Sequence, residues 1–212
     1  MQDHNKRGLQ LGPNLHPGYW LMGLAATTMV LLWMAGEPAT VLLQYDRLAI
    51  LRGEYWRLLT GHLVHAGFRH MALNLAGGAV MAALFAHTYR LRDWILILTA
   101  SLIVIDIGFW FRDRDLETYV GLSGVLHGVL AAGALAWWRT ETRTMALALS
   151  AITVGKLAWE QLQGPVTLAG DDLHVIVNAH LYGAIGGALM GAILLLLGRI
   201  PTRGSKPSHG TV

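Results

Sequence analysis

Six apolar segments of similar length dominate the 212-residue chain and constrain its fold more than any other feature. About 20 residues of α-helix are needed to cross a hydrocarbon core about 30 Å thick. We therefore expect an all-α membrane protein whose segments form a six-transmembrane-helix bundle. The segments run over Tyr19 to Gly36, His70 to His87, Trp94 to Phe111, Ser123 to Trp138, Met145 to Trp159 and Ala179 to Gly198.

Composition supports the membrane assignment and narrows the chemistry. Hydrophobic residues make up 54% of the chain and charged residues 14%, which is too apolar for a water-soluble domain of this size. The chain has no cysteine, so disulfides, thiolate metal sites and a cysteine nucleophile are excluded. The net charge of +3 comes from basic residues scattered through short loops. They indicate membrane topology rather than a nucleic-acid surface, and we expect no nucleic-acid partner.

One membrane domain accounts for nearly all of the chain. We expect it to cover residues 18–200, with flexible tails at residues 1–17 and 201–212. The longest connection, Pro38 to Arg69, carries aromatic residues among charged ones. We expect a structured loop there, between the first two helices and lying in the membrane interface. The lipid bilayer is therefore the first partner that the sequence implies.

The distribution of Lys and Arg predicts the orientation in the membrane. Both tails, and the loops after the second and fourth segments, hold most of the basic residues. Basic loops stay on the cytoplasmic side, so both termini are expected there. The second, fourth and sixth segments then begin at the outer face. Four polar residues should therefore share one depth just below the outer surface: His70, Asn74, Ser123 and His180.

Ser123 and His180 are a candidate nucleophile and its base. A serine becomes nucleophilic when a histidine accepts its proton at hydrogen-bond distance. Two stripes of small residues, spaced by four, would let the fourth and sixth helices pack closely and bring the pair together. The stripes are Gly124, Gly128 and Ala132 on the fourth helix, and Gly183, Gly187 and Gly191 on the sixth.

Donors for an oxyanion are also available at this depth. His70 and Asn74 are four residues apart, so both side chains leave one face of the second helix. The backbone N–H of Ser123 lies at a helix start, where amides lack intrahelical acceptors. These three donors could stabilise the oxyanion that forms when Ser123 attacks a carbonyl.

With these residues the chain resembles the rhomboid family of intramembrane serine proteases. The resemblance implies a rhomboid-like six-helix bundle, no cofactor, and a Ser123/His180 dyad without an acidic third member. It also implies an oxyanion hole formed by His70, Asn74 and the Ser123 amide, and a motif that holds the interfacial loop in place. The matching motifs are Trp56-Arg57 in the loop, His70-x-x-x-Asn74, Gly121-x-Ser123-Gly124 and Ala179-His180-x-x-Gly183.

His127 departs from the family pattern. Many rhomboids carry a tyrosine four residues after the serine, on which the catalytic histidine stacks, and His127 occupies that position here. The Ser-Gly-x-Leu-His-Gly run resembles the rhombosortase branch, which is associated with cleaving the C-terminal Gly-Gly-type sorting signal of exported bacterial proteins. The resemblance implies a bacterial inner-membrane enzyme whose site opens toward the periplasm. Its substrates would be membrane-anchored proteins with such a C-terminal transmembrane sorting signal.

The other histidines admit alternative roles. His127 lies one turn from the candidate nucleophile and is a rival base, although we favour a partner that stacks on His180 or hydrogen-bonds to it. His62, His65 and His70 suggest a metal cluster. Their spacing does not line one helical face, and no carboxylate motif accompanies them, so we expect no metal site.

Ionisable residues within the apolar segments are the remaining candidates. Lys156 and Glu160 are four residues apart and are expected to form a structural pair near the outer surface, with Asp106 near Lys156. Asp171 and Asp172 are interpreted as loop charges rather than as a triad acid. Two other function classes stay open. One is a proton-coupled transporter that uses Asp106, Lys156 and Glu160, and the other is an inactive rhomboid-like protein that binds clients without cutting them.

Overall fold

Long helices make up most of the protein. The computed structural model describes residues 16–165 and 175–200. Within them, six helices are 18 to 21 residues long, and each overlaps one of the six apolar segments. They are α1 (Pro17–Met34), α5 (Phe68–Phe85), α6 (Leu91–Phe111), α7 (Ser123–Thr140), α8 (Arg143–Gln163) and α9 (Val177–Leu196). The tails were expected at residues 1–17 and 201–212, but α1 already begins at Pro17. Residues 1–15 and 201–212, and the loop with Asp171 and Asp172, lie outside the described residues.

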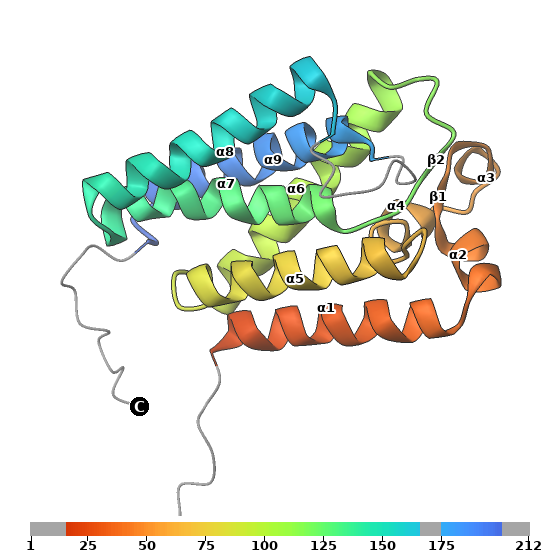
Figure 1. Ribbon diagram of the computed structural model, residues 1–212, viewed down its shortest axis with the longest axis horizontal. Coiled ribbons are helices and arrows are strands. Elements are labelled where there is room, and N and C mark those ends of the chain that lie inside the picture. The colour runs from red at the N-terminus through yellow and green to blue at the C-terminus, as the bar shows by residue number, and fades with distance from the viewer. Residues whose placement is uncertain (1–15, 166–174, 201–212) are drawn as a thin grey trace, which may run out of the picture.

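Helix length and composition separate these helices into two groups. In the described part of the chain, α1, α5, α6 and α9 are long and apolar enough to cross a membrane. α7 and α8 have the length but do not meet the same measure. Figure 1 shows α1, α5, α7 and α8 running side by side, with α6 and α9 packed against α7. The all-α class is therefore confirmed, and a six-span crossing stays a prediction.

The connection between α1 and α5 is folded into short elements. It contains α2 (Glu37–Leu43), β1 (Tyr45–Asp46), α3 (Arg47–Leu51) and α4 (Arg57–Thr60). β1 pairs antiparallel with β2 (Thr118–Tyr119), which precedes α7. The connection is thereby attached to the entrance of α7, while its location in the membrane interface stays a prediction.

Arg57 stabilises this connection through hydrogen bonds to other residues within it. Its Nη1 donates to the carbonyls of Val41 and Gln44, both at 2.9 Å, and its Nε donates to the Glu54 carboxylate at 2.8 Å. Arg57 is buried, so these charge-assisted hydrogen bonds compensate for its loss of hydration. The neighbouring Trp56 side chain is half exposed.

Arg47 ties the same connection to the end of α6. Its Nη2 donates to the carbonyls of Phe109 at 2.5 Å and Asp113 at 2.9 Å, and its Nε donates to Leu116 at 3.0 Å. The last carbonyls of a helix lack intrahelical donors and carry partial negative charge, so a guanidinium there is stabilising. Arg47 therefore links the loop, α6 and the approach to β2.

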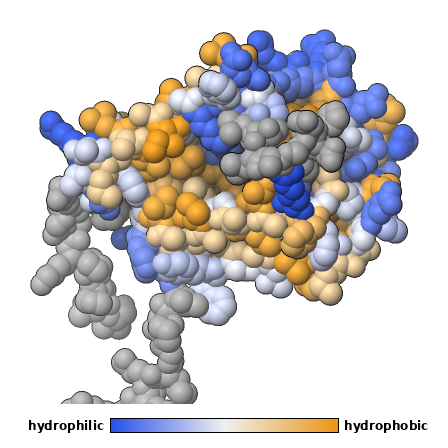
Figure 2. Space-filling view, viewed as in Figure 1, coloured by the Kyte–Doolittle hydropathy of each residue, from blue (hydrophilic) through white to orange (hydrophobic). Residues whose placement is uncertain are grey.

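Apolar side chains cover much of the outer surface. Figure 2 shows them along the face formed by α1 and α5, with hydrophilic residues gathered toward the end that holds α2 and α3. A contiguous exposed apolar surface is costly in water and is expected where lipid covers the protein. Large exposed examples are Leu24, Leu31, Val80, Ile103 and Leu196.

The predicted close packing of α7 on α9 is confirmed. A Cβ atom at Gly183 would overlap the backbone carbonyl of Gly124, and one at Gly187 would overlap that of Gly128. Farther along, a Cβ at Gly191 would lie 3.1 Å from the Ala132 Cα. Close backbone approach of this kind is how small residues join helices in a membrane, where no hydrophobic force acts between helices.

Gly183→Ala tests this packing, with Gly155→Ala as the control. The Cβ at position 183 has no room, so the helices must separate, and we expect a loss of about 1–3 kcal/mol in the free energy of unfolding. A Cβ at Gly155 meets no atom within 4 Å, and that substitution should be neutral or slightly stabilising. Thermal unfolding in detergent micelles measures both. Equal stability of the two variants would contradict the packing.

Candidate active site

Ser123 and His180 meet at one end of the α7–α9 contact. Ser123 is the first residue of α7, and His180 lies in the first turn of α9. The hydroxyl Oγ of Ser123 is 2.9 Å from Nε2 of His180. His180 is buried and Ser123 is half-buried. The two residues are therefore in hydrogen-bond contact in a partly enclosed site.

Gly121 shapes the turn that delivers Ser123. Its φ of +119° lies in a region that side chains disfavour, and a Cβ there would lie 2.6 Å from the His70 ring. Its N–H donates to the Gly61 carbonyl at 3.0 Å, and its carbonyl accepts from the Tyr119 hydroxyl at 2.6 Å. Glycine is therefore required at this position for both conformation and space.

Gly124 lets His180 approach from the other side. A Cβ at Gly124 would lie 2.8 Å from the carbonyl oxygen of Ala179, the residue before His180. A larger residue would push the start of α9 away from α7. The two glycines of the Gly-x-Ser-Gly motif therefore allow the turn before Ser123 and the close approach of α9 after it.

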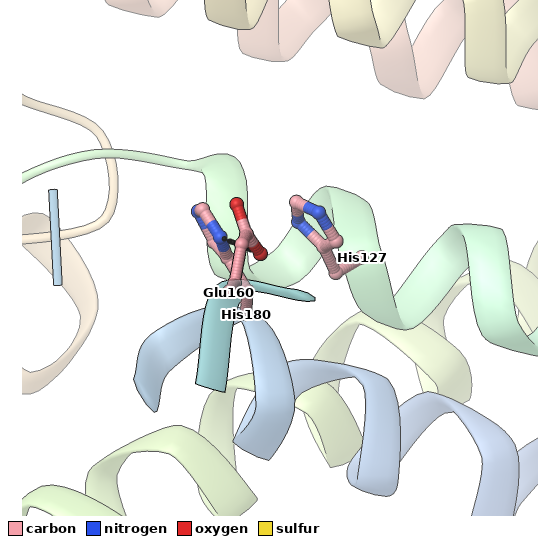
Figure 3. Close-up of side chains that lie close together, drawn as sticks. All are labelled: His127, Glu160 and His180. Carbon is pink, nitrogen blue, oxygen red and sulfur yellow. Dashed lines mark hydrogen bonds and ion pairs between the residues drawn. The ribbon is translucent and has the colours of Figure 1, made fainter. Parts of the chain in front are cut away.

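His127 stacks on His180, which is the role favoured from the sequence. The ring centroids are 4.1 Å apart and the planes meet at 18°. Figure 3 shows His127 beside the face of the His180 ring. Its Nδ1 is 2.7 Å from the Ser123 backbone carbonyl, one helical turn earlier, and must carry a proton to donate there. His180, not His127, makes the contact with the Ser123 hydroxyl.

Glu160 provides an acidic partner that the sequence analysis missed. Its Oε2 lies 2.9 Å from Nδ1 of His180 (Figure 3). Its Oε1 accepts from Lys156 Nζ at 2.6 Å. Only 3% of the Glu160 side chain is exposed, so this carboxylate is screened little by water. The resemblance implied a dyad without an acidic third member, whereas the structure has this carboxylate in contact with His180. The predicted Lys156–Glu160 pair is confirmed.

Two further predicted residues line the same cavity. A cavity of about 310 Å³ is bounded by residues of α5, α7, α8 and α9, among them His70, Asn74, Ser123 and His180. Asn74 is buried, and its Nδ2 donates to the His70 backbone carbonyl at 2.9 Å. An amide nitrogen carries two hydrogens, so one remains for a group in the cavity.

The described residues hold one group with ligand-type atoms close together, formed by His127, Glu160 and His180 within 4.8 Å of one another. A metal must lie near the plane of each imidazole ring that binds it. The two ring centroids are 4.1 Å apart and the planes meet at only 18°, so the lone pairs lie in nearly parallel planes and do not converge on one point. The geometry therefore favours stacking over coordination.

Among the described residues, His62, His65 and His70 do not bring their ring nitrogens together around one point. His62 faces Asp106, with Nε2 3.4 Å from Oδ1, while the rings of His65 and His70 meet edge to face at 5.0 Å. Burial, with a smaller contribution from His70, lowers the pKa of His65 to about 4, so His65 is neutral at physiological pH. His62 and His65 are buried, and His70 borders the cavity of Ser123.

Asp106 is not near Lys156, contrary to expectation. It faces His62 and borders a separate cavity of about 360 Å³ between α3 and α6. Lys156 and Glu160 border the cavity of Ser123 instead. Because the helices face different neighbours, the three ionisable residues do not line one path, which removes the basis for the transporter alternative.

Comparisons with known proteins identify the family of the chain. The family model of the Rhomboid domain matches residues 52–197, which is more than half of the chain. A protein of Bacillus subtilis (strain 168) named "Putative rhomboid protease YdcA" is 26% identical over 144 residues, covering 68% of this chain and 69% of that protein. The matched region contains every predicted site residue. With its apolar helices, the chain is a multi-pass membrane protein that belongs to the rhomboid family.

Proposed function

We propose that this protein is an intramembrane serine endopeptidase in which Ser123 is the nucleophile and His180 its base. The observation that carries the proposal is the 2.9 Å contact between the Ser123 hydroxyl and His180 Nε2 at the wall of a cavity. The histidine nitrogen is at hydrogen-bond distance from the hydroxyl and can accept the serine proton. Membership of the rhomboid family supports the same reaction class.

The reaction proceeds in two halves. Ser123 Oγ attacks the peptide carbonyl carbon while its proton moves to Nε2 of His180. Collapse of the tetrahedral intermediate breaks the C–N bond, and Nε2 returns the proton to the leaving amine. Water then attacks the acyl-enzyme, losing its proton to Nε2, and the serine is regenerated with its proton. An acceptor amine in place of water would transfer the product instead.

Donors for the oxyanion come from α5 and the start of α7. Asn74 and His70 line the cavity with Ser123, and the Ser123 amide lies at a helix start. Donors held in place around a cavity stabilise developing negative charge strongly, because they need no reorganisation during the reaction.

The proposed substrates are membrane-anchored proteins with a C-terminal Gly-Gly-type sorting signal. A helical substrate resists cleavage because its amides are internally bonded, and glycine weakens the helix by about 1 kcal/mol per residue relative to alanine. Cleavage near the outer surface of a bacterial inner membrane, with both termini of the enzyme in the cytoplasm, follows from the loop charges. This is the specificity of the rhombosortase branch that the Ser-Gly-x-Leu-His-Gly run resembles.

Ser123→Ala and His180→Ala should each abolish cleavage of a membrane-anchored Gly-Gly reporter in proteoliposomes, because each removes a reacting group. A fluorophosphonate probe should label the wild-type protein at Ser123 and neither variant. A reporter with Leu-Leu in place of Gly-Gly should resist cleavage. Substantial cleavage by the Ser123→Ala variant would refute the proposed mechanism, and cleavage of the Leu-Leu reporter at an equal rate would refute the proposed specificity.

Asn74→Ala should lower kcat about 100- to 1,000-fold with the protein still folded, as loss of an oxyanion donor does. Gln163→Ala is the matched control, since it removes an exposed amide at the end of α8. Steady-state cleavage of the reporter measures both variants. An unchanged kcat for Asn74→Ala would show that Asn74 serves only to join helices.

His127→Tyr should keep cleavage within about tenfold of the wild type, because a tyrosine ring preserves the stack and such aromatic pairs contribute about 0.5–1.5 kcal/mol. His127→Ala, which removes the stack, should be slower than His127→Tyr. Reporter cleavage and thermal unfolding are measured together. Complete loss of cleavage in a folded His127→Tyr protein would instead make His127 the candidate base.

A further inference from the structure

We infer that Glu160 is a positioning residue for His180, and that Lys156 holds the Glu160 carboxylate in place. The inference rests on the proposed function, since it adds a carboxylate from α8 to the serine and histidine from α7 and α9. The described geometry is a continuous chain of four side chains, from Lys156 through Glu160 and His180 to Ser123.

The two ring nitrogens of His180 have separate partners. Nδ1 lies 2.9 Å from Glu160 Oε2, and Nε2 lies 2.9 Å from Ser123 Oγ. A neutral imidazole has one donor nitrogen and one acceptor nitrogen. A carboxylate can only accept, so the proton resides on Nδ1 and the lone pair of Nε2 faces the serine hydroxyl. Glu160 thus selects the tautomer that general-base catalysis requires.

Glu160 also opposes the charge that forms during the reaction. Proton transfer from Ser123 converts His180 to an imidazolium, and a carboxylate in contact with it stabilises that state. The site is buried, so the attraction is screened less than at a surface. Glu160 itself keeps its charge and transfers no proton.

Lys156 explains how Glu160 stays ionised inside an apolar helix. Its ammonium donates to Oε1 at 2.6 Å, one helical turn away on the same face, while a third of its side chain stays exposed. Burying a lone carboxylate would cost several kcal/mol. Lys156 compensates that cost on one oxygen and leaves the other for His180.

A purely structural tie between α8 and α9 is the competing explanation. Gln161, the next residue, also reaches α9, with its Nε2 3.5 Å from the Val177 carbonyl. Buried ion pairs, however, often contribute little net stability, because apolar residues can replace them without loss. The test must therefore separate catalysis from folding.

Glu160→Gln tests the inference in purified full-length protein reconstituted in proteoliposomes with the Gly-Gly reporter. We expect kcat to fall about 100-fold with KM within about twofold, because both oxygens of the Glu160 carboxylate are engaged by Lys156 and His180 rather than by substrate. Glu160→Asp keeps the charge and should recover at least about tenfold of that loss. Glu117→Gln makes the same chemical change at an exposed position and should match the wild type. A kcat for Glu160→Gln within twofold of the wild type would overturn the inference.

Lys156→Met tests the same chain of contacts with Glu160 still in place, so its effect in the wild-type background does not depend on how well Glu160→Gln folds. In that variant the Lys156 ammonium faces the forming imidazolium without the carboxylate between them. Lys156→Met should lower kcat in the wild-type background, because Glu160 loses the ammonium that holds it in place. In the Glu160→Gln background the same change should raise kcat roughly threefold, because it removes a positive charge near the forming imidazolium. Thermal unfolding of each variant accompanies the kinetics. Equal effects of Lys156→Met in the two backgrounds would overturn the role assigned to Lys156.

Fluorophosphonate labelling separates failure of this inference from failure of the proposed function. If the wild-type protein is not labelled at Ser123, the serine protease proposal itself is wrong. If the wild-type protein is labelled and folded Glu160→Gln is labelled at the same rate, the protease proposal stands and the positioning role is wrong. Labelling that slows in Glu160→Gln and recovers in Glu160→Asp supports both.

Discussion

Close backbone contact between α7 and α9 is the constraint on which the rest of the site depends. Gly183 and Gly187 pack against the backbone carbonyls of Gly124 and Gly128 so closely that a Cβ atom would not fit. Because the two helices cross at this distance near the starts of both, Ser123 and His180 come within 2.9 Å of each other. A residue larger than glycine at these positions would push α7 and α9 apart and lengthen the distance between the Ser123 hydroxyl and His180 Nε2.

The segments before α7 hold the serine at a fixed position. The β1–β2 pair attaches the folded connection of residues 37–67 to the chain just before Gly121, and Arg47 binds that connection to the end of α6. Gly121 then turns the chain with a positive φ against the His70 ring. Ser123 therefore begins a helix whose entrance is held by contacts from three separate parts of the sequence.

Polar groups are concentrated around one cavity inside an apolar bundle. His127 covers a face of His180, Glu160 contacts its Nδ1, and Lys156 neutralises Glu160. Each of these groups would be costly if it lay alone among apolar helices, and each becomes tolerable through its neighbour. The mutual compensation explains why four ionisable side chains lie together rather than scattered through the spans.

The sequence by itself determined the helical segments, the small-residue stripes and the positions of Ser123 and His180 near the starts of two helices. These follow from hydrophobic length and a period near 3.6 residues, which are local properties of the chain. Only the tertiary structure decided that Glu160 meets His180 and that Asp106 faces His62 instead of Lys156. Such pairs depend on how each helix is rotated about its axis and where it crosses its neighbours. Packing of the whole bundle sets that rotation, and no single segment encodes it.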